Sequence, residues 1–186
     1  MLITGESGVG KTTLCKKYVE RYPRIDLTEK TKVPVLLARI PFPATPKNLV
    51  TVLLAELGDP LSDKGTTFSK TKRLFKLLKE CEVELIILDE FQHFIDRDSD
   101  KVLNTISDWL KQLINESKLP IVLVGLSESI KILEANSQLR RRFAMSDELT
   151  NFDWVGNSNP ENSNKNENNK SNTNKEKRWI KVLGFL

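Results

Sequence analysis

A glycine-rich segment close to the first residue has the composition of a phosphate-binding loop. Residues 5–12 read Gly-Glu-Ser-Gly-Val-Gly-Lys-Thr, which fits the Walker A pattern in full. Its glycines let backbone N–H groups curl around phosphates, and the helix that follows adds the positive end of its dipole. We expect Lys11 to reach the β- and γ-phosphates of ATP and the Thr12 hydroxyl to coordinate Mg²⁺. The residues expected to hold the nucleotide are Gly5, Glu6, Ser7, Gly8, Val9, Gly10, Lys11, Thr12 and Thr13.

Two acidic residues that follow an apolar run match a Walker B segment. Leu85–Leu88 have the composition of a buried strand, and Asp89 follows at its carboxyl end, where open α/β sheets place their ligands. We expect Asp89 to orient the Mg²⁺ shell and Glu90 to polarise the attacking water. An acidic pair after a strand could also cap a helix, but its combination with a Walker A segment predicts an ATPase.

The remaining catalytic candidates are less specific. Ser127 follows the apolar run 121–124, so it could sense the γ-phosphate or simply cap the next helix. Arg141 and Arg142 could stabilise developing phosphoryl charge, especially from a neighbouring subunit, or form a solvated basic face. His93, the one histidine of the sequence, is predicted to be structural or a hydrogen-bonding partner at the edge of the site.

Alternating helices and strands must position these residues. Short apolar runs suit strands that are buried on both faces, and apolar residues at helical spacing indicate amphipathic helices. Thr45 is the expected N-cap of the second helix. The pattern predicts strands at 2–4, 33–40, 85–88 and 121–124 and helices at 11–22, 47–57, 69–81, 102–117 and 127–135. The predicted fold class is α/β, a P-loop NTPase three-layer α/β/α sandwich with a parallel sheet.

Length and composition exclude several other classes of protein. A chain of 186 residues with 39% hydrophobic residues suits one domain with a packed core. No apolar run is long enough to span a bilayer and no secretory signal is visible, so we expect no membrane partner. Cys15 and Cys81 lack metal-ligand spacing and fit the reducing cytoplasm. A net charge of +4 is too small for bulk basicity to argue for nucleic acid.

Composition divides the chain into three segments. Residues 1–155 form the expected ATPase core. Residues 156–177 belong to an asparagine-rich stretch that cannot bury enough apolar surface to offset its ordering entropy, so we expect a disordered linker. Residues 178–186 are apolar again and form a short C-terminal remnant.

Four segments together resemble a known family. They are residues 5–12, Leu-Asp-Glu-Phe-Gln-His at 88–93, Leu-Pro-Ile-Val-Leu-Val-Gly at 119–125 and Gln-Leu-Arg-Arg-Arg-Phe at 138–143. Over about residues 1–155 the chain resembles the TniB/TnsC family of AAA+ ATPases, which regulate target choice in Tn7-like and Tn5053-like DNA transposition. The resemblance implies a protein that binds ATP and Mg²⁺, assembles as a ring or helical filament on duplex DNA, and recruits a transposase and a target-selector protein. It also implies that Arg142, or else Arg141, acts as an arginine finger in trans.

The same resemblance places DNA contacts on two segments ahead of the Walker B strand. Lys47, Lys64 and Thr66 match the positions that face the duplex in the family. Lys47 would neutralise a phosphate and Thr66 would hydrogen-bond one, which positions a protein on DNA without reading base sequence. The alternative for Lys47 is a solvated residue in the first turn of a helix.

Departures from the family pattern keep other functions open. Members carry a segment before the Walker A loop and a helical lid after the core, and both are expected to be largely missing from this chain. The alternatives are a non-hydrolysing scaffold that binds DNA or partners, a degenerate remnant, and another P-loop ATPase such as a helicase loader.

Overall fold

The computed structural model describes residues 1–94, 100–135, 137–143 and 145–150. All of them fall within a unit that spans Met1–Asn151. The predicted linker at 156–177 and the predicted apolar segment at 178–186 lie outside the described residues.

A five-stranded sheet runs through the described part of the chain. Its strand order is β4-β5-β6-β1-β7, and every adjacent pair is parallel. The strands are β1 Leu2–Gly5, β4 Val35–Arg39, β5 Leu85–Asp89, β6 Ile121–Val124 and β7 Ser146–Leu149. β1 lies between β6 and the edge strand β7, so the loop that leaves β1 is next to the loop that leaves β6.

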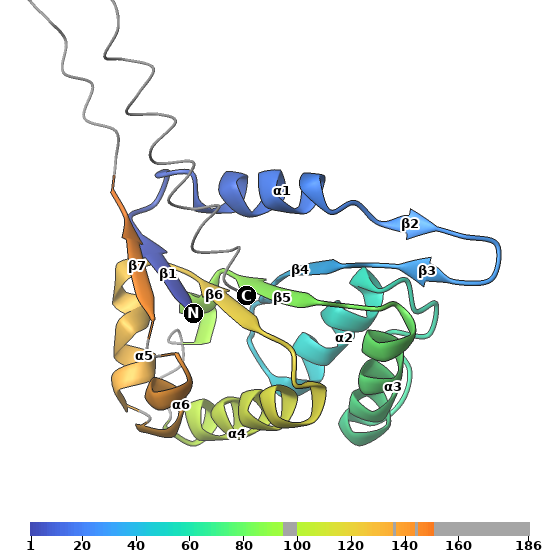
Figure 1. Ribbon diagram of the computed structural model, residues 1–186. Coiled ribbons are helices and arrows are strands. Elements are labelled where there is room, and N and C mark those ends of the chain that lie inside the picture. Colours follow the sequence, from blue (N-terminus) through green and yellow to red (C-terminus); the bar gives the residue numbers. More distant parts are fainter. Residues whose placement is uncertain (95–99, 136, 144, 151–186) are drawn as a thin grey trace, which may run out of the picture. The chain divides into compact units, whose positions relative to one another are not determined.

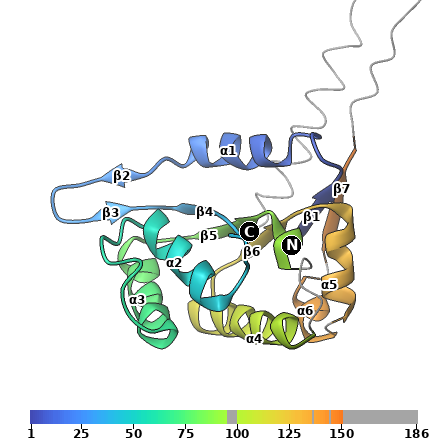
Figure 2. The same cartoon turned by 180° about the vertical axis from the view of Figure 1, so that it is seen from behind.

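Helices cover both faces of the sheet (Figures 1 and 2). The helix that follows the Walker A loop, α1 (Lys11–Arg21), lies on one face. On the opposite face lie α2 (Pro46–Glu56), α3 (Thr67–Glu80) and α4 (Asp100–Ser117). The predicted three-layer P-loop NTPase fold with a parallel sheet is confirmed.

The central strands are apolar because they are covered on both sides. Every residue of β5 and β6 is buried, and Ile86 and Leu123 are fully inaccessible. Leu53 of α2 and Leu74 of α3 pack into the same core. Each such side chain contributes about 1.5–3 kcal/mol through burial, so this layer holds the carboxyl ends of the strands in fixed positions.

Two predicted element boundaries shift for identifiable reasons. The strand predicted at 33–40 is limited to β4, because Val33 donates its N–H to Cys81 O at 2.8 Å instead of joining the ladder. The helix predicted to begin at residue 69 begins at Thr67, because the Thr66 hydroxyl caps it and accepts a hydrogen bond from Ser69 N at 3.2 Å. Thr45 is the N-cap of α2, as predicted.

Several elements had no clear sequence signal. The segment predicted as one helix at 127–135 begins as a 3₁₀ turn, η2 (Ser127–Ser129), and continues as α5 (Ile130–Ala135). It is followed by α6 (Ser137–Arg142) and the polar edge strand β7. Another 3₁₀ turn, η1 (Phe91–Phe94), follows β5.

A short hairpin precedes β4. Its strands are β2 (Ile25–Asp26) and β3 (Thr31–Lys32), each too short to produce a periodic pattern. Lys30 and Lys32 both pair with Glu82, and they lower the pKa of its carboxyl to about 2. These ion pairs join the hairpin to the turn after α3.

Among the described helices, none is both long and apolar enough to cross a membrane.

Candidate active site

The carboxyl ends of β1, β5 and β6 lie side by side at one edge of the sheet. Ile3 is in register with Val124, and Leu88 is in register with Leu123. Since the strands are parallel, the loops that leave them open on the same side. This register brings residues of the Walker A and Walker B segments together across 77 positions of sequence.

Two glycines of the Walker A loop are required by its backbone. Gly10 adopts a left-handed conformation, with φ at 91°, where it forms the N-cap of α1. A Cβ added to Gly5 would lie 2.3 Å from the carbonyl oxygen of Leu149 on β7, which is closer than any side chain tolerates. These positions keep the loop tight and leave its N–H groups directed toward a ligand.

Lys11 lies within the loop that precedes it. Its ammonium group donates to Gly5 O at 2.9 Å and to Glu6 O at 2.6 Å. Both acceptors are uncharged carbonyls, so anionic phosphate oxygens would compete for the ammonium group effectively. The lysine is therefore held beside the position where phosphates would lie.

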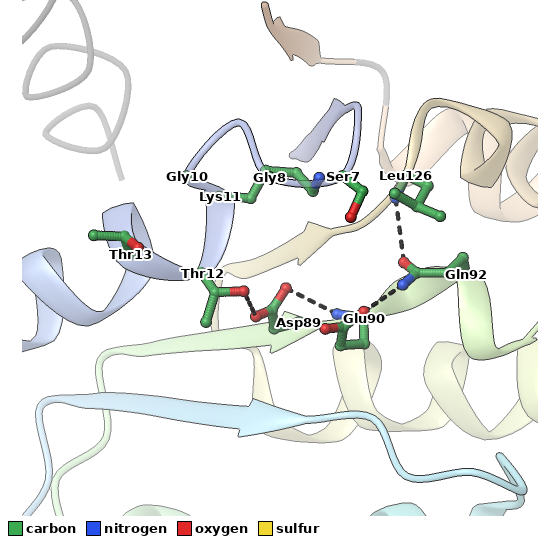
Figure 3. Close-up of a pocket in the computed structure, with 10 residues that line it drawn as sticks. All are labelled: Ser7, Gly8, Gly10, Lys11, Thr12, Thr13, Asp89, Glu90, Gln92 and Leu126. Atoms are coloured by element: carbon green, nitrogen blue, oxygen red, sulfur yellow. Dashed lines mark hydrogen bonds between the residues drawn. The ribbon is translucent and has the colours of Figure 1, made fainter. Parts of the chain in front are cut away.

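Thr12 and Asp89 meet directly. The Thr12 hydroxyl donates to Asp89 Oδ2 at 2.6 Å (Figure 3). One hydroxyl and one carboxylate are oxygen ligands of the kind that Mg²⁺ prefers, and Mg²⁺ commonly takes its remaining ligands from waters and substrate phosphates. The pair fits Mg²⁺ bound together with a nucleotide, although the described residues contain no cluster of three or more His, Cys, Asp or Glu side chains that could hold a metal alone.

Glu90 has an unusual backbone and two side-chain partners. Its φ is 63°, in the left-handed region, and its N–H donates to Asp89 Oδ1 at 2.9 Å. Arg39 Nη2 donates to Glu90 Oε1 at 3.0 Å from the edge strand β4. Gln92 Nε2 donates to Glu90 Oε2. The left-handed turn therefore lets adjacent acidic side chains point to different partners.

These residues line a cavity of about 330 Å³ (Figure 3). Pockets of this size upward are typical of small-molecule sites. The lining consists of Ser7, Gly8, Gly10, Lys11, Thr12, Thr13, Asp89, Glu90, Gln92 and Leu126. The predicted nucleotide, metal and base residues thus converge, except that Gly5, Glu6 and Val9 support the loop without lining the cavity.

Ser127 lies just outside this lining, one residue after Leu126. Its hydroxyl donates to Glu148 Oε1 of β7 at 3.1 Å. It is also the first residue of η2, and no side-chain cap hydrogen bond is present at that turn. The N-cap residue of that turn is Leu126, so both alternatives for Ser127, sensing and capping, stay predictions.

The arginines at 140–142 belong to α6 and do not line the cavity. Leu139 and Phe143 are buried and fix this helix to the core. Arg141 and Arg142 are exposed, as is Arg140. Their side chains are therefore open to solvent.

The predicted DNA-contact residues lie on a different part of the surface. Lys47 is exposed in the first turn of α2, and Lys64 is exposed in the loop before α3, where it pairs with Asp63. Thr66 is exposed, and its hydroxyl caps α3. α2 packs against α3, and Lys70 Nζ in the first turn of α3 donates to Thr51 Oγ1 in the middle of α2 at 2.7 Å.

His93 and Cys15 support the site from outside. His93 Nδ1 lies 2.8 Å from the carbonyl oxygen of Ile40, which is the hydrogen-bonding environment expected for a structural residue at the edge. Burial raises the pKa of the Cys15 thiol to about 12, and the negative charge of Asp89 adds to this shift. A buried, protonated thiol behind Asp89 acts as an apolar packing group.

The fold, the Walker A loop and the acidic pair Asp89 and Glu90, which lines the same cavity as that loop, define a P-loop NTPase. A family model described as Bacterial TniB protein matches residues 1–152. The chain belongs to this TniB family, and the resemblance inferred from its motifs is confirmed.

Solved structures that match the chain include two proteins of Aeropyrum pernix. The ORC2 protein of Aeropyrum pernix in its ADPNP–ADP complexes matches with a TM-score of 0.59 and 19% identity over 80% of this chain and 41% of that one. The ORC1 protein of the same organism in complex with DNA matches with a TM-score of 0.52 and 18% identity over 80% and 38%. The chain thus spans about two fifths of their length. No protein with a curated description matches.

Arg39 and Gln92 are the site residues that sequence reasoning missed. Arg39 ends an apolar strand, and Gln92 lies within the segment used for the family resemblance, but neither has a spacing that signals chemistry. The contact of Arg39 with Glu90 and that of Gln92 with Leu126 depend on the order of β4, β5 and β6, which no local pattern shows.

Proposed function

We propose that this protein is an ATPase of the AAA+ class that regulates DNA transposition. The observation that carries the proposal is the convergence of Lys11, the Thr12–Asp89 pair and Glu90 on one cavity. ATP and Mg²⁺ would be bound by the loop 5–13, with Thr12 and Asp89 on the metal. Glu90 would polarise the attacking water, and Ser127 would lie close enough to respond to the γ-phosphate.

The family and the surface support action on duplex DNA. TniB membership makes a role in transposition the leading candidate. The exposed Lys47 and Lys64, together with the Thr66 hydroxyl, would contact the phosphate backbone, which requires no base recognition. A ring or filament of this chain on DNA would then recruit a transposase and a target-selector protein. The two free cysteines support a place in the reducing cytoplasm.

ATP turnover measured with and without duplex DNA tests the proposal. We expect the wild-type chain to hydrolyse ATP faster when DNA is present, and Lys11→Ala to lose turnover because no ammonium group then neutralises the phosphates. Lys17→Ala is the matched control, because Lys17 is an exposed lysine of the same helix that pairs with Glu20. No turnover by the wild type would favour a non-hydrolysing scaffold, and normal turnover by Lys11→Ala would overturn the assigned site.

A further inference from the structure

One side chain connects the two loops that border the phosphate end of the cavity. Gln92 Nε2 donates to Glu90 Oε2, and Gln92 Oε1 accepts a hydrogen bond from Leu126 N at 3.2 Å. Figure 3 shows the resulting chain from the segment after β5 to the segment after β6. Gln92 is partly buried and lines the cavity.

The two partners require a primary amide at this position. A carboxylate only accepts hydrogen bonds and a backbone N–H only donates them, which fixes the orientation of the Gln92 amide. Glutamate at this position would lack the donor for Glu90, and asparagine would be one methylene too short to reach both partners. The two hydrogen bonds of Gln92 therefore depend on the amide group itself and not only on the size of the side chain.

The neighbouring glycine shows how closely the second loop approaches. A Cβ added to Gly125 would lie 2.5 Å from Ser129 Oγ and 3.1 Å from Gln92 Oε1. Gly125 does not have a positive φ, so the lack of room for a Cβ, and not the backbone conformation, accounts for a glycine at this position. The loop after β6 is thus packed directly against the Gln92 amide.

Arg39 also binds the Glu90 carboxylate, and its side chain is the more exposed of that pair. It binds the other oxygen of Glu90, and its side chain is 73% exposed, whereas that of Glu90 is 24% exposed. An exposed ion pair contributes little and is weakened by salt, so the Arg39 contact is the easier one to release. The Gln92 contact then remains to orient the carboxylate.

We propose that Gln92 is a positioning residue that aims Glu90 at the attacking water and couples it to the loop containing Leu126 and Ser127. The inference rests on the proposed ATPase function. A displacement of this loop by the γ-phosphate is transmitted through the amide to the carboxylate. Gln92 itself transfers no proton and touches Glu90 rather than the reacting atoms.

The test is turnover and ATP binding by Gln92→Glu, a variant of nearly the same size. It places a second carboxylate beside Glu90, while Asp89, Arg39 and Lys11 remain around it. Glutamate has no N–H to donate, so the Glu90 carboxylate loses the group that orients it and is repelled by its new neighbour. We expect kcat to fall about tenfold or more with KM and the affinity for a fluorescent ATP analogue nearly unchanged.

Gln112→Glu is the matched control. Gln112 donates to Glu116 on the surface of α4, so the same chemical change is made at an exposed amide–carboxylate pair. We expect its kcat and KM to equal those of the wild type. An unchanged kcat in Gln92→Glu, with normal turnover by the wild type, would overturn the role of Gln92 and leave the proposed function intact.

Amide hydrogen exchange gives a readout that does not need ATP hydrolysis. Gln92→Leu removes the acceptor of the Leu126 N–H, so exchange at Leu126 should accelerate while exchange in β5 and β6 stays slow. Unchanged exchange at Leu126 would overturn the coupling even if the wild type hydrolysed no ATP. If the wild type hydrolysed no ATP but exchange at Leu126 still accelerated in Gln92→Leu, the proposed function alone would be refuted.

Discussion

Glu90 shows how a single residue can hold a conformation that its type disfavours. A left-handed backbone costs a residue with a Cβ roughly 1–2 kcal/mol. Its N–H bond to Asp89 and its two side-chain partners offset this cost. Strain of this kind is concentrated at functional positions, and here it separates the directions of two adjacent carboxylates.

The residue-scale prediction concerns Glu90→Gln. This change keeps the shape and removes the base, so ATP should still bind while kcat falls about 100-fold or more. Single-turnover hydrolysis and analogue binding measure the two effects separately. Glu84→Gln, at the opposite end of β5, is the control and should leave both values unchanged. Hydrolysis at the normal rate by Glu90→Gln would show that the carboxylate has no such role.

At the scale of elements, the N-termini of α2 and α3 combine a structural and a proposed functional role. The Thr45 and Thr66 hydroxyls cap these helices, and Lys47 and Lys64 lie next to the caps. The packing of α2 against α3 brings the proposed DNA-contact segments to one region, although each contributes only a few charges. Thr66 must therefore be tested in a way that separates capping from DNA contact.

Three substitutions of Thr66 make that separation. Thr66→Ala removes the cap and should lower the free energy of unfolding by about 1 kcal/mol. Thr66→Asn and Thr66→Asp are both good caps and should leave stability nearly unchanged. If Thr66 lies against a DNA phosphate, Thr66→Asp alone among the capped variants should weaken duplex binding through repulsion. Equal DNA affinity for Thr66→Asn and Thr66→Asp would assign Thr66 to capping only.

At the scale of the whole molecule, the described part of the chain presents a site and an arginine helix that do not meet. The cavity is lined by the Walker A loop, the start of α1, the end of β5 and the segments that follow β5 and β6, whereas Arg141 and Arg142 are exposed on α6. Burial of Leu139 and Phe143 limits how far α6 could turn toward the cavity of its own chain. A second copy is therefore the proposed recipient of the arginine.

Mixing two inactive variants tests this arrangement. Arg142→Ala should lose at least about 10³ in kcat if it removes an arginine finger, and Lys11→Ala should lose turnover through its own site. In an equal mixture, an intact Arg142 from the Lys11→Ala chain can serve an intact site in the other chain, so part of the activity should return. Arg140→Ala is the control and should remain active. Absence of any recovery in the mixture would argue against a finger in trans.

The sequence by itself determined those features of the protein that depend only on residues close together in the chain. The Walker A loop, the Walker B strand, the Thr45 cap and the core helices each follow from a local composition or period, because a loop conformation and an amphipathic face are local properties. These features were sufficient to predict the parallel P-loop NTPase fold and the convergence of Thr12 with Asp89.

The tertiary structure alone decided which residues surround Glu90. The strand order places Arg39 of β4 and the loop after β6 on either side of β5, and the polar strand β7 brings Glu148 to Ser127. Edge strands such as β7 need no apolar run, since one side is open to water. Contacts between residues distant in sequence depend on strand order and packing, so no local pattern could have revealed the Gln92 bridge.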